Sequence, residues 1–141
     1  MKINSDDFNQ VVPTEYTAGF ANEIGSSAMF FDPRKLLLDK HTGLVFVSSG
    51  TRIRQINITE TTSGGLADVE LRVGTIAGTS MKGTEWVPQW PAGENATFKF
   101  PNGMALDQDG NIYVVDTDAR NIRFLERFED FLFFYFSRIF S

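Results

Sequence analysis

The chain has 141 residues, a net charge of −5, one histidine and no cysteine. This length favours one globular domain, and the lack of cysteine excludes disulfides and thiolate chemistry without fixing the compartment. No cluster of lysine and arginine is present, which argues against nucleic-acid binding, because such binding depends on basic groups that neutralise phosphates. No apolar run reaches the ~20 residues of a membrane-spanning helix, so no transmembrane segment is expected.

Residues 1–14 are expected to form an N-terminal extension, and a first strand is expected near residues 15–18. Runs rich in β-branched and aromatic residues then predict strands over residues 35–39, 44–48, 52–58 and 70–77. Thr42-Gly43 marks a tight turn between the first two of these, because glycine tolerates positive φ. The polar stretch 59–65 is predicted to be a flexible link.

A second group of strands is predicted over residues 103–107, 112–115 and 121–125, with a hairpin turn at Asp109-Gly110-Asn111. The apolar runs of both groups hardly alternate with polar residues, which indicates strands covered on both faces. No sustained helical period occurs before residue 127. The fold class predicted is therefore all-β.

The two groups are copies of one unit. Residues 36–39 match residues 104–107, residues 45–47 match residues 112–114, and Ile53-Arg54 match Ile122-Arg123. Matched positions are separated by 67 to 69 residues, as expected for one unit with small insertions in its loops. A repeated unit of this size indicates a repeat architecture.

The second copy resembles the NHL repeat, which builds β-propellers. The residues that carry this resemblance are Pro101, Gly103, Asp107, Gly110, Asn111, Asp116 and Arg123. In the first copy, Lys35 replaces the glycine and Ser49 replaces the strand-end aspartate. The resemblance covers residues 15–126, with repeats at about 28–78 and 96–126, and it implies a partial β-propeller of about two four-stranded antiparallel blades.

Two blades leave a propeller ring open, because closed rings have roughly four to eight blades. The chain is therefore expected to be a piece of a longer propeller, one part of an assembly, or a marginal fold. The first of these is favoured. Missing propeller blades or a protein partner would then cover the open blade faces.

The tail over residues 127–141 is rich in phenylalanine and departs from the repeat. It has two interpretations: an apolar segment that serves as a strand or partner contact, or sequence foreign to the propeller. The second is favoured because the composition changes abruptly.

No catalytic constellation is visible. Asp107 to Asn111 fail the spacing of a calcium-binding EF-hand loop and are expected to form a turn. Asp116 is expected to hold backbone amides and an arginine rather than a metal. His41 has no activated serine beside it in sequence and is expected to be a solvated turn residue. No cofactor or metal is predicted.

Both tryptophans, Trp86 and Trp90, lie in an insertion of about nine residues between the copies. They are expected either to cover the blade edge as a lid, which is favoured, or to form a partner-binding loop. The function predicted is non-catalytic recognition of a protein or ligand by a propeller segment. The alternative is part of a metal-dependent propeller hydrolase or lyase whose ligands lie outside this chain.

Overall fold

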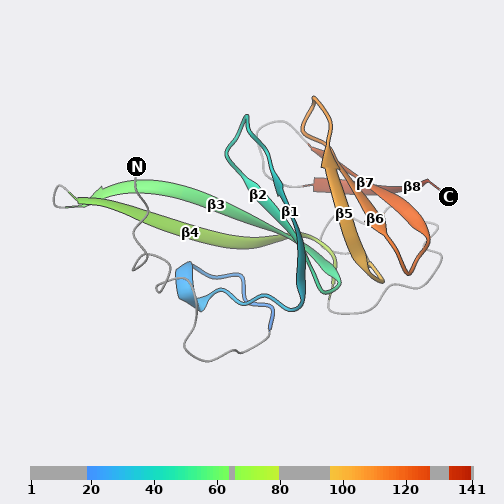
Figure 1. Ribbon diagram of the computed structural model, residues 1–141, viewed down its shortest axis with the longest axis horizontal. Helices are drawn as coiled ribbons and strands as arrows, with labels where there is room; N and C mark the ends of the chain where they lie inside the picture. Colours follow the sequence, from blue (N-terminus) through green and yellow to red (C-terminus); the bar gives the residue numbers. More distant parts are fainter. Residues whose placement is uncertain (1–18, 64–65, 80–95, 128–133, 141) are drawn as a thin grey trace.

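The structure is a computed structural model that describes residues 19–63, 66–79, 96–127 and 134–140. In this part of the chain the secondary structure is one short 3-10 turn, η2 (Gly25–Ser27), and strands β1 to β8. The strands form two four-stranded antiparallel sheets, in the orders β1-β2-β3-β4 and β5-β6-β7-β8 (Figure 1). This confirms the predicted all-β fold. Each sheet has the strand order of a propeller blade, and the sheets do not close into a ring.

The first sheet consists of β1 (Pro33–Leu38), β2 (Val45–Ser49), β3 (Arg52–Ser63) and β4 (Leu66–Ala77). Gly43, in the turn between β1 and β2, has a φ of +75°, which explains the need for glycine there. The prediction of a flexible link over residues 59–65 is wrong for residues 59–63, because β3 and β4 stay paired as far as Ser63 and Leu66, while residues 64–65 lie outside the described residues. Three of the residues involved are threonines, whose β-branched side chains favour extended backbone over a loop.

The second sheet consists of β5 (Pro101–Leu106), β6 (Ile112–Asp116), β7 (Asn121–Arg127) and β8 (Phe134–Phe140). The sequence predicted only three strands here. The fourth, β8, lies in the phenylalanine-rich tail and pairs antiparallel with β7. Residues 134–140 of the tail therefore supply a strand, and the interpretation that the tail is foreign to the propeller stays a prediction. Aromatic residues favour the strand conformation, although the tail lacks the repeat's polar pattern.

The hydrophobic core lies between the two sheets, which stand side by side in Figure 1. We call this packing the blade junction. The first sheet contributes apolar residues from all four of its strands, among them Leu37, Phe46, Ile53, Ile76 and Ala77. The second sheet contributes Met104, Leu106, Ile112, Val114 and Leu125 from β5, β6 and β7. Each such side chain contributes about 1.5–3 kcal/mol when it is fully buried. The junction is therefore the main source of cohesion between the blades.

Polar contacts fix the relative position of the two sheets. Arg127 Nη1 lies 3.0 Å from Asp39 Oδ2 across the junction. Ser48 Oγ donates a hydrogen bond to the backbone carbonyl of Asn102 at 3.2 Å. These directional bonds select one register for the apolar faces, which area burial alone does not do.

The strand register supports the sequence repeat position by position. Val47 pairs with Arg54 in the first sheet, and Val114 pairs with Arg123 in the second. Leu38 likewise pairs with Val45, as Leu106 does with Ile112. Residues matched in sequence therefore occupy matched places in the two blades.

Candidate functional site

Arg54 is the largest of the fully buried side chains. Its guanidinium donates hydrogen bonds to the carbonyls of Met29 at 2.9 Å and Ala21 at 2.7 Å, and to Asn22 Oδ1 at 3.0 Å. Burial, followed by the nearby charge of Arg52, lowers the pKa of Arg54 to about 10, which leaves it charged at neutral pH. Arg54 therefore fastens residues 21–29 to the first sheet.

Arg123 has the same role in the second sheet. It is buried and donates a hydrogen bond to the carbonyl of Thr97. Burial lowers the pKa of Arg123, and the carboxylate of Asp116, 4.0 Å away, offsets part of this effect. The guanidinium carbon of each arginine lies 5.2 Å from the centre of a phenylalanine ring, Phe30 for Arg54 and Phe98 for Arg123.

Asp116 and Ser49 occupy the matched ends of β6 and β2. The Asp116 carboxylate accepts hydrogen bonds from the backbone amides of Lys99 at 3.0 Å and Phe100 at 2.7 Å. In the first sheet, Ser49 Oγ accepts from the amide of Phe31 at 3.1 Å and donates to its carbonyl at 2.7 Å. A hydroxyl thus replaces the carboxylate as the anchor of the incoming chain, and both side chains are committed to the backbone.

Asp39 and Asp107 organise the two β-hairpin turns. Asp107 accepts from the amides of Asp109 and Asn111 and from the Asn111 side chain, and Gly110 in the same turn has a φ of +82°. Burial raises the pKa of Asp107, but these hydrogen bonds outweigh it and the net pKa is lowered. These contacts among Asp107, Asp109, Gly110 and Asn111 form a turn.

The remaining repeat positions also belong to the scaffold. Pro101 is buried, and its carbonyl accepts a hydrogen bond from Arg34 at 3.3 Å. Gly103 lies in β5, where an added Cβ would make only ordinary contacts with Val115. His41 is exposed in the first turn, with its backbone amide bonded to Asp39. Among the described residues, no three His, Cys, Asp or Glu side chains gather as a metal site would require.

Trp86 and Trp90 lie outside the described residues, so their sequence interpretations stay as predictions. No helix in the described part of the chain is long and apolar enough to cross a membrane.

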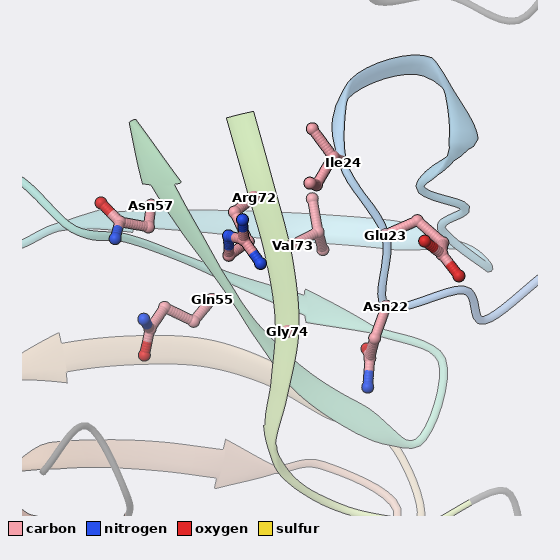
Figure 2. Close-up of a pocket in the computed structure, with 8 residues that line it drawn as sticks. All are labelled: Asn22, Glu23, Ile24, Gln55, Asn57, Arg72, Val73 and Gly74. Carbon is pink, nitrogen blue, oxygen red and sulfur yellow. The ribbon is translucent and has the colours of Figure 1, made fainter. Parts of the chain in front are cut away.

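A pocket of about 320 Å³ runs along β4. Figure 2 shows Gln55 and Asn57, from β3, on one side of β4 and Asn22, Glu23 and Ile24 on the other. The segment with Glu23 reaches β4 through a hydrogen bond from the amide of Val73 to the Glu23 carbonyl, at 3.0 Å. The pocket thus depends on the same segment that Arg54 fastens.

Gln55 is the most informative residue of the pocket. Its side chain is 9% exposed, and its Oε1 atom is buried without a hydrogen-bond partner among the described residues. A buried acceptor left without a partner costs about 1–3 kcal/mol, so such groups mark places where a partner is expected. Gly74, opposite Gln55 in the pairing of β3 with β4, keeps the space open, because an added Cβ would meet no heavy atom within 4 Å.

The chemistry of the pocket suits binding. It offers the amides of Gln55 and Asn57 and the guanidinium of Arg72, which pairs with Glu70 at 3.2 Å. These groups donate and accept hydrogen bonds. The Glu23 side chain points away from β4 (Figure 2). None of the lining residues is a serine, cysteine or histidine that would act as a nucleophile with its base.

The sequence analysis missed this pocket. The one signal was Gly74, an isolated glycine inside a strand, where the missing side chain leaves the sheet surface uncovered. Nothing in the sequence indicated that residues 22–24 return to β4, since they form no regular element of their own.

Residues 98–122 match the family model of the NHL repeat. The chain therefore contains an NHL repeat, as its sequence predicts, and the repeat coincides with β5 and β6 and the segments that flank them. NHL repeats build propeller-type recognition modules, and the two sheets have the form of partial propeller blades. Searches of curated proteins and of solved structures found no match to this chain.

Proposed function

We propose that this chain is a non-catalytic recognition segment of a larger β-propeller assembly and that it binds a polar ligand or partner side chain in the pocket along β4. The segment extends over residues 15–126. The buried, unpartnered Oε1 of Gln55 carries the proposal, because it is an acceptor that the described chain leaves without a donor. The neighbouring Arg72 and Asn57 supply donors for the same ligand.

The buried charges outside the pocket support a non-catalytic role. Arg54 and Arg123 hold backbone carbonyls, and Asp116 holds backbone amides. A group whose hydrogen-bonding capacity is used by the scaffold is not free to bind substrate. The insertion with Trp86 and Trp90 is proposed as a second partner contact.

The pocket is tested by filling it. Gly74→Leu places a side chain in open space at a residue without positive φ, so we expect the fold to tolerate it. Glu60→Leu adds the same side chain at an exposed position of the same hairpin and is the matched control. Partners captured on the immobilised chain are purified and titrated against each variant. We expect Gly74→Leu to weaken binding by at least tenfold and Glu60→Leu to leave it unchanged.

Two results would overturn the proposal. Equal binding by Gly74→Leu and the unaltered chain would remove the pocket from recognition. Stoichiometric divalent metal in the purified chain, together with metal-dependent turnover of a lactone or ester, would favour the hydrolase or lyase alternative. Metal content is measured by mass spectrometry and turnover by product release.

A further inference from the structure

Each sheet has two faces, and the blade junction uses one face of each. We call the face of the first sheet that enters the junction its trailing face, with Leu37, Phe46, Ser48 and Ile53. The face of the second sheet that meets it is the leading face, with Met104, Leu106, Ile112, Val114 and Leu125. The repeat gives every one of these residues a counterpart in the other sheet.

Several counterparts of the junction residues are apolar but exposed. The trailing face of the second sheet carries Tyr113, Val115 and Ile122, with exposures of 37%, 43% and 41%. Their counterparts in the junction, Phe46, Ser48 and Ile53, have exposures of 1%, 0% and 0%. The same places in the repeat are thus buried in one blade and open in the other.

The leading face of the first sheet shows the same contrast. Leu36 is 72% exposed and Leu38 is 53% exposed, whereas their counterparts Met104 and Leu106 pack against the core. The inner part of this face is already covered, since Val47 is 3% exposed. The open patch lies on β1, which together with β2 contacts β5 in the blade junction.

We propose that these two open faces bind each other between copies of the chain, head to tail, so that the trailing face of one copy's second sheet packs on the leading face of the next copy's first sheet. Each face is the repeat counterpart of one side of an interface that the chain already forms. A second copy therefore offers a complementary surface at both ends. This inference rests on the proposed propeller assembly and names what completes it.

Such contacts are heterologous, and they close into a ring when the rotation per copy allows it. Propellers close with roughly four to eight blades, so a chain with two blades would assemble as about two to four copies. A pocket along β4 of each copy would then repeat around the ring.

One difference from the internal junction sets the strength of the contact. Inside the chain, Arg127 of the second sheet pairs with Asp39 of the first at 3.0 Å. In the head-to-tail contact the counterpart of Asp39 is Asp107, and the counterpart of Arg127 is Ile58, which is 48% exposed. The contact between copies lacks this ion pair, so we expect it to be weaker than the internal one and to depend on concentration.

The experiment measures the mass of the full chain by light scattering during size exclusion, over a range of concentrations up to about 100 µM. Leu36→Lys places a charge on the leading face of the first sheet, and Val115→Lys places one on the trailing face of the second. Each side chain is exposed in a single copy, so the folded monomer should tolerate both changes. Thr59→Lys, at an exposed place on the β3–β4 hairpin, is the control.

We expect the unaltered chain and Thr59→Lys to form a discrete species of about two to four copies and each face variant to be a monomer. Mixed together, the two face variants should form pairs and nothing larger, because each retains the face that the other lacks. Ile58→Arg should tighten the association by roughly three- to tenfold, since it offers Asp107 the missing cation.

If the unaltered chain were a monomer at 100 µM, the proposal would be wrong, and the two open faces would have to be covered by other blades. Growth without limit would overturn ring closure. If only one of the two face variants blocked assembly, the contact would be isologous rather than head to tail. None of these results depends on the pocket, which is tested separately by the binding affinity of Gly74→Leu.

Discussion

The two sheets of this chain are one repeat in two settings. Both hold the incoming chain with a buried arginine at a matched place in the third strand and with a polar side chain at the end of the second strand. They differ in which face is buried. The first sheet buries Phe46 and Ile53, and the second exposes their counterparts Tyr113 and Ile122.

This difference separates what a blade needs for itself from what it needs from its neighbours. The arginine and the strand-end polar group act within one blade, and both blades keep them. The apolar faces act between blades, and each is satisfied only where a second sheet is present. Variants of the contacts inside each blade and of the contacts between blades test this division.

The largest effect is expected at Arg54. Arg54→Met leaves the carbonyls of Met29 and Ala21 and the side chain of Asn22 without their donor, and we expect a loss of about 3–5 kcal/mol in the free energy of unfolding. Arg54→Lys should recover little, because an ammonium lacks the planar set of donors. Urea denaturation measures both.

Arg72→Met is the control for this prediction, because the Arg72 side chain is 63% exposed and makes only a surface ion pair. We expect a change below about 1 kcal/mol. Similar losses for Arg54→Met and Arg72→Met would show that the buried guanidinium does not anchor residues 21–29.

The strand-end anchors should differ in strength. Asp116→Ala removes a carboxylate that holds the amides of Lys99 and Phe100, with an expected cost of about 2–3 kcal/mol. Ser49→Ala removes a neutral hydroxyl that bonds only Phe31, with an expected cost of about 1 kcal/mol. The free energy of unfolding of Asp116→Ser should lie between those of Asp116→Ala and the unaltered chain, because a serine, Ser49, anchors the incoming chain in the first sheet. Equal losses for the two alanine variants would refute the ranking.

A small effect is also expected at the ion pair across the junction. Arg127→Met should cost about 1 kcal/mol at neutral pH, since the Arg127 side chain is 30% exposed and partly screened. Burial raises the pKa of Asp39, but hydrogen bonds from Thr42 and His41 and the charge of Arg127 outweigh it, so the folded pKa lies below the unfolded value of about 3.9.

The pH dependence follows from this direction. The stabilisation by the Asp39 carboxylate is fully present above pH 4 or so and is lost as the pH falls through the folded pKa. The difference between Arg127→Met and the unaltered chain should therefore shrink in acid. A difference that stays constant from pH 7 down to about pH 2 would mean that Asp39 is not the partner.

The sequence predicted most of the fold because the repeat is local. Strand positions and turns follow from short runs such as Asp109-Gly110-Asn111, whose residues also make the turn's contacts. It predicted the inner parts of β3 and β4 but failed for the outer part of their hairpin, where a polar composition favoured a loop. It also failed for β8, which is fixed by its pairing with β7. It could not predict which face of each sheet is covered, because matched residues carry the same pattern whether or not a neighbour is present.

The pocket could not be predicted from the sequence for a different reason. Gln55 and Gly74 lie opposite each other only after β3 and β4 pair, and residues 22–24 join them only because Arg54 holds their segment in place. The role of Gln55 has a measurable consequence for stability and binding. Gln55→Met should keep or slightly raise stability, by up to about 1 kcal/mol, because it removes a buried acceptor without a partner, while ligand binding is lost. Lost stability together with unchanged binding would contradict the role given to Gln55.

The most direct test compares two isoleucines at one repeat position, Ile53 and Ile122. Urea unfolding of Ile53→Ala and Ile122→Ala is measured in dilute solution and again near 100 µM chain. We expect Ile53→Ala to cost about 2–4 kcal/mol at both concentrations, because Ile53 is fully buried in the blade junction. Ile122→Ala should cost less than about 1 kcal/mol in dilute solution and more at high concentration, where another copy covers it. Equal costs for the two variants in dilute solution would contradict the assignment of one blade face as buried and the other as open.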